Sequence, residues 1–184
     1  MKYNKEVLNL SITIRLGTKN DIDELELLYD SMNDHLAATT NYSGWKKGIY
    51  PIRATAEDGI NEGCLYVAVA GDKIVGTFIL RHEPEPAYLP VKWRKPLTYD
   101  EVFVIYTFVV HPDHLGQGVG QALLNFASQH GAQSNMKALR LDVYENNLPA
   151  IRLYEKCGFH YIATVDLGLS EFNLPWFKLY EKLL

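Results

Sequence analysis

The segment HPDHLGQGVGQALL, residues 111–124, places a glycine at every second position, at Gly116, Gly118 and Gly120. An apolar run typical of a strand, residues 103–110, precedes it, and apolar residues at helical spacing follow it. In such an arrangement the first N–H groups of the helix point outward, the helix dipole favours negative charge, and glycine lets a ligand touch the backbone. The segment therefore predicts an anion-binding loop whose natural ligand is a pyrophosphate.

The residues within this segment exclude two nucleotide-binding motifs. A phosphate-loop NTPase requires Lys and then Ser or Thr after its last glycine, whereas Gln121 and Ala122 follow Gly120 here. A dinucleotide-binding fold requires the spacing Gly-x-Gly-x-x-Gly, whereas the spacing here is Gly-x-Gly-x-Gly. From this segment alone, a glycine-rich turn without any ligand remains an alternative.

The N-terminal half predicts a strand, two helices and a hairpin. The strand covers residues 12–16, and a helix over residues 18–36 begins with Thr18 and Asp21 at capping-box spacing. A second, short helix covers residues 52–63. Two β-rich runs around Gly71 and Asp72 predict a hairpin over residues 64–80.

The C-terminal half predicts alternating strands and helices after an irregular segment. Residues 82–101 contain four prolines and are expected to be irregular, and the nearly all-apolar run 102–110 predicts a strand buried on both faces. Further strands are expected at 138–144, 159–168 and 176–184, and helices after the glycines and from Pro149 to Gly158. Without a repeat or linker, these elements predict one domain, residues 1–184, with helices packed on a mixed sheet.

Composition and charge restrict the class of protein. The net charge of −4 argues against a nucleic-acid partner, which requires a basic face, and is compatible with an amine substrate. Cys64 and Cys157 lie far apart without metal-ligand spacing, which indicates reduced thiols in a cytosolic protein. The opening segment, residues 1–17, is too polar for a signal peptide, and no apolar run is long enough to span a membrane. We therefore expect a cytoplasmic protein.

Two segments of the C-terminal half form a recognisable pair. VVHPDHLGQGVGQALL has a core close to Arg/Gln-x-x-Gly-x-Gly/Ala ahead of a helix, and LRLDVYENNLPAIRLYEKCGF follows Asn-x-x-Ala-x-x-Leu-Tyr-x-x-x-Gly-Phe. The second match runs through Asn147, Ala150, Leu153, Tyr154, Gly158 and Phe159. In this order and at this separation, the two motifs resemble those of the GNAT superfamily of acetyl-CoA-dependent N-acetyltransferases. The resemblance covers roughly residues 64–168.

The resemblance implies a mixed α+β fold of the GNAT type. Its central twisted sheet has six to seven mostly antiparallel strands flanked by helices, and it splays between the fourth and fifth strands to make a slot for acetyl-CoA. The implied cofactor contacts are Phe108, Val109, Val110, Leu115, Gly116, Gln117, Gly118, Val119, Gly120, Gln121, Asn147 and Tyr154. Leu115 departs from the family pattern, because relatives usually carry Arg or Gln there.

The resemblance also implies catalytic roles. Tyr154 matches the tyrosine that protonates the departing thiolate of CoA, although a core aromatic residue would also fit this position. Asp142 stands where some relatives carry a catalytic carboxylate, and Glu101, Glu145 and Tyr106 are rival candidates for the base. A backbone N–H group near Val110 would hold the oxyanion.

Two aromatic loops are the candidate walls of the acceptor site. They supply Trp45, Tyr50, Tyr88 and Trp93, each of which is also compatible with ordinary packing. We expect no metal, because His111, Asp113 and His114 lie in a turn that disfavours a fixed ligand set.

The sequence as a whole predicts an enzyme that transfers an acetyl group from acetyl-CoA to a primary amine by direct attack, with a homodimer as one possible assembly. A non-catalytic module of the same fold that binds or senses acyl-CoA is the alternative.

Overall fold

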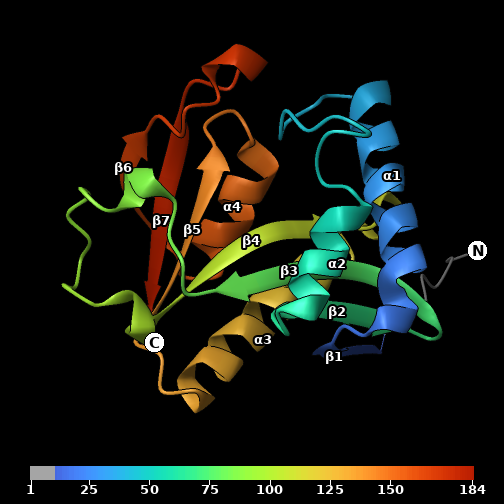
Figure 1. Cartoon of the computed structure of the whole chain (residues 1–184), viewed down its shortest axis with the longest axis horizontal. Coiled ribbons are helices and arrows are strands. Elements are labelled where there is room, and N and C mark those ends of the chain that lie inside the picture. Colours follow the sequence, from blue (N-terminus) through green and yellow to red (C-terminus); the bar gives the residue numbers. More distant parts are fainter. Residues whose placement is uncertain (1–10) are drawn as a thin grey trace, which may run out of the picture.

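The computed structural model describes residues 11–184, so most of the opening segment, for which we predicted no signal peptide, lies outside the described residues. Seven strands form one sheet in the order β1-β2-β3-β4-β5-β7-β6 (Figure 1). The strands are β1 Ile12–Leu16, β2 Leu65–Ala70, β3 Lys73–Arg81, β4 Val102–Val110, β5 Ala138–Tyr144, β6 His160–Val165 and β7 Phe177–Leu183. The α-helices are α1 Ile22–Ala38, α2 Arg53–Asn61, α3 Val119–Gln133 and α4 Leu148–Lys156.

The sheet opens between β4 and β5. These strands are parallel and pair only over their first residues, from Val102 with Ala138 to Val104 with Arg140. All other neighbouring strands are antiparallel. Beyond Val104 the edge of β4 that faces β5 is unpaired, and the two strands diverge in Figure 1. The predicted mixed, mostly antiparallel sheet that splays between its fourth and fifth strands is therefore confirmed.

Helices cover both faces of the sheet. One hydrophobic cluster joins α3 and α4 to residues of β2–β5 and β7, including Leu123, Ile151 and Tyr180. A second cluster joins α1 and α2 to the opposite face through Leu25, Ala56 and other residues. A third cluster lies beneath the proline-rich segment 82–101, which packs over β4, β5 and β7 around the fully buried Tyr88. The site described below is therefore supported from both sides.

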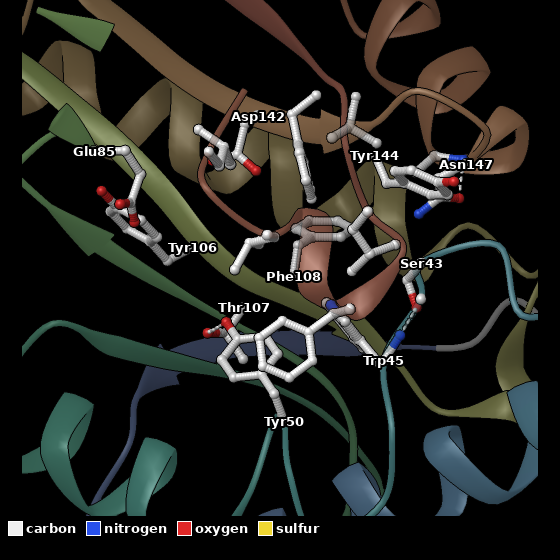
Figure 2. A pocket seen from close by; sticks show the side chains of 18 of the residues that line it. Ser43, Trp45, Tyr50, Glu85, Tyr106, Thr107, Phe108, Asp142, Tyr144 and Asn147 are labelled. Atoms are coloured by element: carbon white, nitrogen blue, oxygen red, sulfur yellow. Dashed lines mark hydrogen bonds between the residues drawn. The ribbon is translucent and has the colours of Figure 1, made fainter. Parts of the chain in front are cut away.

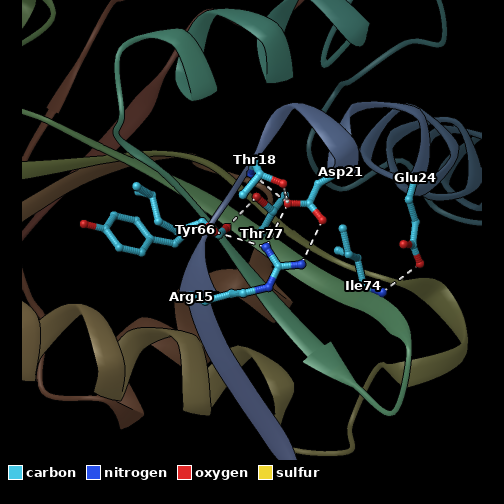
Figure 3. A network of polar contacts seen from close by, with 8 residues as sticks. Arg15, Thr18, Asp21, Glu24, Tyr66, Ile74 and Thr77 are labelled. Carbon is cyan, nitrogen blue, oxygen red and sulfur yellow. Dashed lines mark hydrogen bonds and ion pairs between the residues drawn. The ribbon is translucent and has the colours of Figure 1, made fainter.

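Polar contacts fasten the start of α1 to the sheet (Figure 3). The Asp21 carboxylate accepts hydrogen bonds from both terminal nitrogens of Arg15, each at 2.8 Å, and from the Thr18 N–H at 2.7 Å. The bond from the Thr18 N–H is a contact of the predicted capping box, and the Thr18 hydroxyl also donates to Asp21 at 2.9 Å. Glu24 accepts from the backbone N–H of Ile74 in β3 at 2.8 Å. These contacts fix β1, α1 and β3 together.

Three local predictions need adjustment. A 3-10 turn at Lys19–Asp21 precedes α1, so the α-helix begins later than predicted. α4 begins at Leu148, one residue before Pro149, because Asn147 caps it. β4 is not buried on both faces: its residues Phe103, Tyr106, Phe108 and Val110 are partly exposed. No helix among residues 11–184 is long and apolar enough to cross a membrane.

Candidate functional site

The glycines between β4 and α3 have two different roles. Gly116 and Gly118 have φ angles of +74° and +87°, which side chains rarely adopt, and the space where a Cβ atom would stand is open at both. Gly120 instead lies against α4, where a Cβ atom would come within 2.8 Å of the Leu153 Cδ2 atom. Two of the glycines therefore shape an open loop, whereas the third allows close packing of two helices.

A cavity of about 540 Å³ lies over this loop, and we call it the glycine-loop cavity. Its wall includes most of the predicted cofactor contacts, namely Phe108, Val109, Val110, Leu115, Gly116, Gly118, Val119, Gly120, Gln121 and Asn147. The N–H groups of the first turn of α3 have no acceptor within the helix, because no residue precedes them there. Hydrogen bonding inside α3 begins with the Ala122 N–H, which donates to Gly118 at 2.9 Å. The cavity therefore offers backbone donors suited to an anion.

A second cavity of about 430 Å³ lies between the diverging strands, and we call it the aromatic cavity. Residues of β4, β5 and α4 line it, together with the loops 43–50 and 167–177. Figure 2 shows Glu85 and Tyr106 toward one end of this cavity, Tyr144, Asn147 and Ser43 toward the other, and Trp45 and Tyr50 along the side. The aromatic side chains make most of this wall apolar.

The two cavities meet. Both are lined by Ser43, Trp45, Phe108, Asn147 and Ala150, whereas Glu85, Tyr106 and Asp142 line only the aromatic cavity. A ligand held over the glycine loop can therefore extend toward a second ligand in the aromatic cavity. This junction is where a reaction between the two would take place.

Asn147 stands at the junction and begins α4. Its Oδ1 atom accepts a hydrogen bond from the Ala150 N–H at 3.3 Å, so the side chain acts as the N-cap of the helix. The amide NH₂ group has no hydrogen-bond acceptor among residues 11–184. It remains available as a donor to a ligand in either cavity.

Tyr154 extends from α4 to the wall of the aromatic cavity. Its ring packs edge-on against Phe108, with 5.9 Å between the ring centroids, and only 6% of the residue is exposed. No hydrogen bond from a described residue acts on its hydroxyl, which leaves the hydroxyl available to a ligand in the cavity. Burial raises the pKa of the phenol, and the negative charge of Asp142 raises it further. The hydroxyl therefore keeps its proton over the physiological pH range.

Asp142 lies on β5 in the wall of the same cavity. Burial raises the pKa of its carboxyl group from the ordinary value of 3.8 to about 6, and the charge of Glu85 also raises it. A hydrogen bond of 2.7 Å from the Tyr88 hydroxyl to Oδ2 works in the opposite direction. A carboxylate with a pKa close to neutrality is suited to accept a proton.

The backbone of β4 bulges where it passes the aromatic cavity. The pairing register with β3 shifts between Thr77 and Ile79, and Thr107 on β4 has a φ angle of +47°, which is unusual for a β-branched residue. The Thr107 hydroxyl is hydrogen bonded to the Tyr50 hydroxyl at 2.6 Å. The bulge lies next to Phe108, which lines both cavities, and the bond to Tyr50 ties it to the loop 43–50.

Several predicted residues do not line either cavity. The Gln117 side chain turns back onto the Asp113 carbonyl group and His114. Tyr88 is fully buried and contacts the site through its hydrogen bond to Asp142. The ring of Trp93 packs against Arg140, whose Cζ atom lies 4.1 Å from the ring centroid. These two aromatic residues were expected as acceptor walls, but the folding of segment 82–101 places them in the core beneath it.

The rival bases are placed differently from Asp142. Glu101 accepts hydrogen bonds from Thr98 at the start of β4 and lines neither cavity. Glu145 also lies outside both walls. Tyr106 lines the aromatic cavity, but its hydroxyl donates to the Glu83 carbonyl oxygen at 2.8 Å.

Sequence reasoning missed Glu85, which supplies the second carboxylate of the aromatic cavity. It lies within the proline-rich segment, and no spacing rule predicts which of its side chains turns inward. The described residues contain no group of three or more His, Cys, Asp or Glu side chains arranged to hold a metal ion.

Comparison with known proteins places this site in a family. Residues 29–159 match the sequence model of the acetyltransferase (GNAT) family. The matched range includes β4, the glycine loop, α3, β5 and α4, which are the elements that build both cavities.

Curated relatives cover parts of the chain. A streptothricin acetyltransferase of Escherichia coli is 37% identical over 70 residues, which are 38% of this chain and 40% of that protein. An uncharacterised N-acetyltransferase of Methanocaldococcus jannaschii is 28% identical over 158 residues, 84% of this chain and 64% of that protein. The chain therefore spans less than two thirds of the length of either relative.

Solved structures share the fold at low identity. A crystal structure of a GNAT-family acetyltransferase from Streptococcus agalactiae superposes with a TM-score of 0.76 and 21% identity, over 94% of this chain and 95% of that chain. At this level of identity the likeness concerns the fold alone.

Proposed function

Because this chain belongs to the acetyltransferase (GNAT) family, we propose that it transfers the acetyl group of acetyl-CoA to a primary amine of a small molecule or peptide. One observation carries the proposal: the glycine-loop cavity and the aromatic cavity meet at Phe108 and Asn147. The first offers backbone donors for a pyrophosphate, and the second offers an apolar chamber with carboxylates. A two-substrate transfer requires such a pair of connected chambers.

The residues over the glycine loop fit acetyl-CoA. The open space at Gly116 and Gly118 admits a bulky anion against the backbone, and the first turn of α3 supplies N–H donors for its pyrophosphate. The unpaired edge of β4 beyond Val104 offers N–H and C=O groups to the amide groups of the pantetheine arm. When bound, acetyl-CoA supplies an activated thioester carbonyl group. Leu115, 46% exposed at the cavity wall, offers an apolar surface in place of a polar contact.

We assign to Asp142 the role of the base. A protonated amine has no free electron pair, so it must lose a proton before it can attack. With its pKa raised to about 6, the Asp142 carboxylate accepts this proton at neutral pH, directly or through one water molecule. Tyr88 orients the carboxylate through its hydrogen bond to Oδ2.

The backbone of β4 and the Tyr154 hydroxyl complete the transfer. The amine nitrogen forms a bond to the carbonyl carbon, the carbon–sulfur bond breaks, and the products are an amide and the thiol of CoA. The bulged backbone at Phe108 offers an N–H group to the carbonyl oxygen as negative charge develops on it. The Tyr154 hydroxyl gives its proton to the departing sulfur and recovers one from solvent.

A non-catalytic acyl-CoA sensor of the same fold is the second candidate. It would need only the glycine-loop cavity. The carboxylate of Asp142 and the free hydroxyl of Tyr154 on one cavity wall favour an enzyme, because a sensor requires neither group.

An assay for release of the CoA thiol with a panel of amines tests the proposal. We expect thiol release that depends on the amine, together with a matching acetylated product detected by mass spectrometry. Binding of acetyl-CoA without transfer to any amine, in a panel that includes small amines and peptides, would support the sensor instead.

A further inference from the structure

The far end of the aromatic cavity carries an unpaired negative charge. Glu85 lines this end, away from the junction residues Ser43 and Asn147 (Figure 2). Its carboxylate forms no hydrogen bond or salt bridge to any side chain among residues 11–184. The nearby cation Arg81 does not line the cavity and is held by Glu62, at 2.7 Å between Nε and Oε2.

The surroundings of Glu85 suit a positive charge. The aromatic rings of Tyr50 and Tyr106 line the same cavity, and the electron-rich face of an aromatic ring attracts cations. The Tyr106 ring already has one such partner, because the Cζ atom of Arg81 lies 5.9 Å from its centroid. Lys46 is the cation on the described wall, and it lies on an exposed loop. The cavity wall thus has two carboxyl side chains, Asp142 and Glu85, and one amine side chain, Lys46.

The two carboxylates have different positions relative to the reaction. Asp142 lies on β5, close enough to Tyr154 for its charge to raise the pKa of that phenol. Glu85 comes from the proline-rich segment, at the opposite end of the cavity from Asn147 (Figure 2). An amine that reacts at the junction therefore extends its remaining atoms toward Glu85. A second cationic group on that part of the molecule would meet an unpaired carboxylate.

We propose that the acceptor is a small amine that carries a second positively charged nitrogen, and that Glu85 binds this nitrogen. The proposal rests on the proposed acetyltransferase function and specifies its substrate class. In this assignment Glu85 determines specificity, and Asp142 takes the proton of the reacting amine.

A series of linear α,ω-diamines, each paired with the linear monoamine of matched length, tests the proposal. We expect kcat/KM of the wild-type protein to favour the best diamine over its matched monoamine by roughly 10- to 100-fold, the range for a hydrogen bond to a charged group. Glu85→Gln should lose most of this preference. The ratio of kcat/KM between a diamine and its matched monoamine is the readout, because the charge of Glu85 also raises the pKa of Asp142 and its loss alters the rate with both classes of amine.

Glu83→Gln is the matched control, because Glu83 lies two residues away, is exposed and lines neither cavity. It should keep the full preference. No preference for diamines in the wild-type protein, or a preference that Glu85→Gln retains, would overturn the proposal even where acetyl transfer itself is observed.

A binding measurement separates this proposal from the acetyltransferase function. Calorimetric titration of CoA-saturated protein with a diamine needs no turnover. If no amine is acetylated, tighter binding of diamines than of monoamines that is lost in Glu85→Gln still supports the cation site. Equal binding of both classes contradicts it.

Discussion

The hydroxyl of Tyr154 can be removed without disturbing the packing of its ring, so its variant tests a catalytic role separately from a structural one. Tyr154→Phe keeps the ring against Phe108 and removes only the proton donor. We expect a fall in kcat of roughly 10- to 100-fold, the low end for general acid catalysis, because a thiolate is already a tolerable leaving group. The melting temperature and the affinity for acetyl-CoA should change little. Full activity in this variant would mean that water protonates the thiolate.

Asp142 predicts a pH profile for the reaction. Because its carboxylate must be ionised to act as base, kcat/KM should rise with pH through about 6 and then level off until another group titrates. Asp142→Asn should remove this acidic limb and most of the activity. A wild-type profile that is flat between pH 5 and pH 8, roughly the range around this pKa, would exclude Asp142 as the base.

The same raised pKa predicts an effect on stability with the opposite sign to that of most carboxylates. The folded state binds the Asp142 proton more tightly than the unfolded chain, so this group makes folding less favourable as pH rises from 3.8 to about 6. Asp142→Asn should therefore raise the melting temperature above pH 6 by a few degrees. Below pH 4 the two proteins should have the same melting temperature. Thermal unfolding of both proteins, once above pH 6 and once below pH 4, measures this difference.

The glycine loop is expected to bind its ligand through its backbone, so the conformation of that backbone is what a variant should test. Gly118 has a φ angle of +87° and open space beside it, and Asn tolerates this conformation better than other side chains do. Gly118→Asn should therefore fold but place its side chain where we propose that the pyrophosphate binds. We expect KM for acetyl-CoA to rise roughly tenfold.

Gly48 provides the control for this loop variant. It has a φ angle of +74°, also with open space beside it, and lies outside both cavity walls. Gly48→Asn should leave KM for acetyl-CoA unchanged. Equal KM values for acetyl-CoA in the two variants would mean that the glycine segment is a turn that binds no ligand.

The junction of β1 and α1 predicts a second, independent pH dependence of stability. Hydrogen bonds from Arg15 and Thr18 lower the pKa of Asp21 to about 2. Its stabilising contribution is thus complete above 3.8 and is lost as pH falls through about 2. Asp21→Asn should reduce the free energy of unfolding by about 2 kcal/mol at pH 7, measured in urea, and by less as pH falls below 4.

Asp23 in the first turn of α1 gives the comparison for that measurement. Its side chain is 87% exposed and contacts Arg53 at the surface. Because exposed ion pairs contribute little, Asp23→Asn should change the stability by less than about 1 kcal/mol. Similar losses in both variants would mean that burial of Asp21 has no special effect.

The protein as a whole should respond to its cosubstrate through its stability. One continuous sheet joins β1 to β6, and the glycine-loop cavity draws its wall from α1, β4, α3 and α4. We therefore expect one cooperative unfolding transition. Acetyl-CoA at about 100 times its Kd should stabilise the folded state by about 2.7 kcal/mol, or several degrees in Tm. Equal shifts with ATP, or none with acetyl-CoA at millimolar concentration, would contradict the proposed cofactor site.

The strands, the helices and the local motifs could be predicted from the order of the amino acids. A nearly all-apolar run predicted β4 and apolar residues at helical spacing predicted α3, because such patterns depend on residues that are close along the chain. The splayed sheet was implied by the resemblance of the two motifs to the GNAT superfamily. The candidate roles of Tyr154 and Asn147 were likewise implied by that resemblance. Their catalytic and binding functions stay predictions until the variants are measured.

Which side chains share the site depends on packing between elements that are far apart in the sequence. The Tyr50–Thr107 hydrogen bond joins residues 57 positions apart, and the Tyr88–Asp142 bond joins residues 54 apart. The inward turn of Glu85 and the packing of Trp93 on Arg140 likewise depend on how segment 82–101 folds over the sheet. Spacing rules act within a few residues, whereas these contacts are set by the packing of whole elements. The motifs thus locate the site, and long-range packing selects its polar groups.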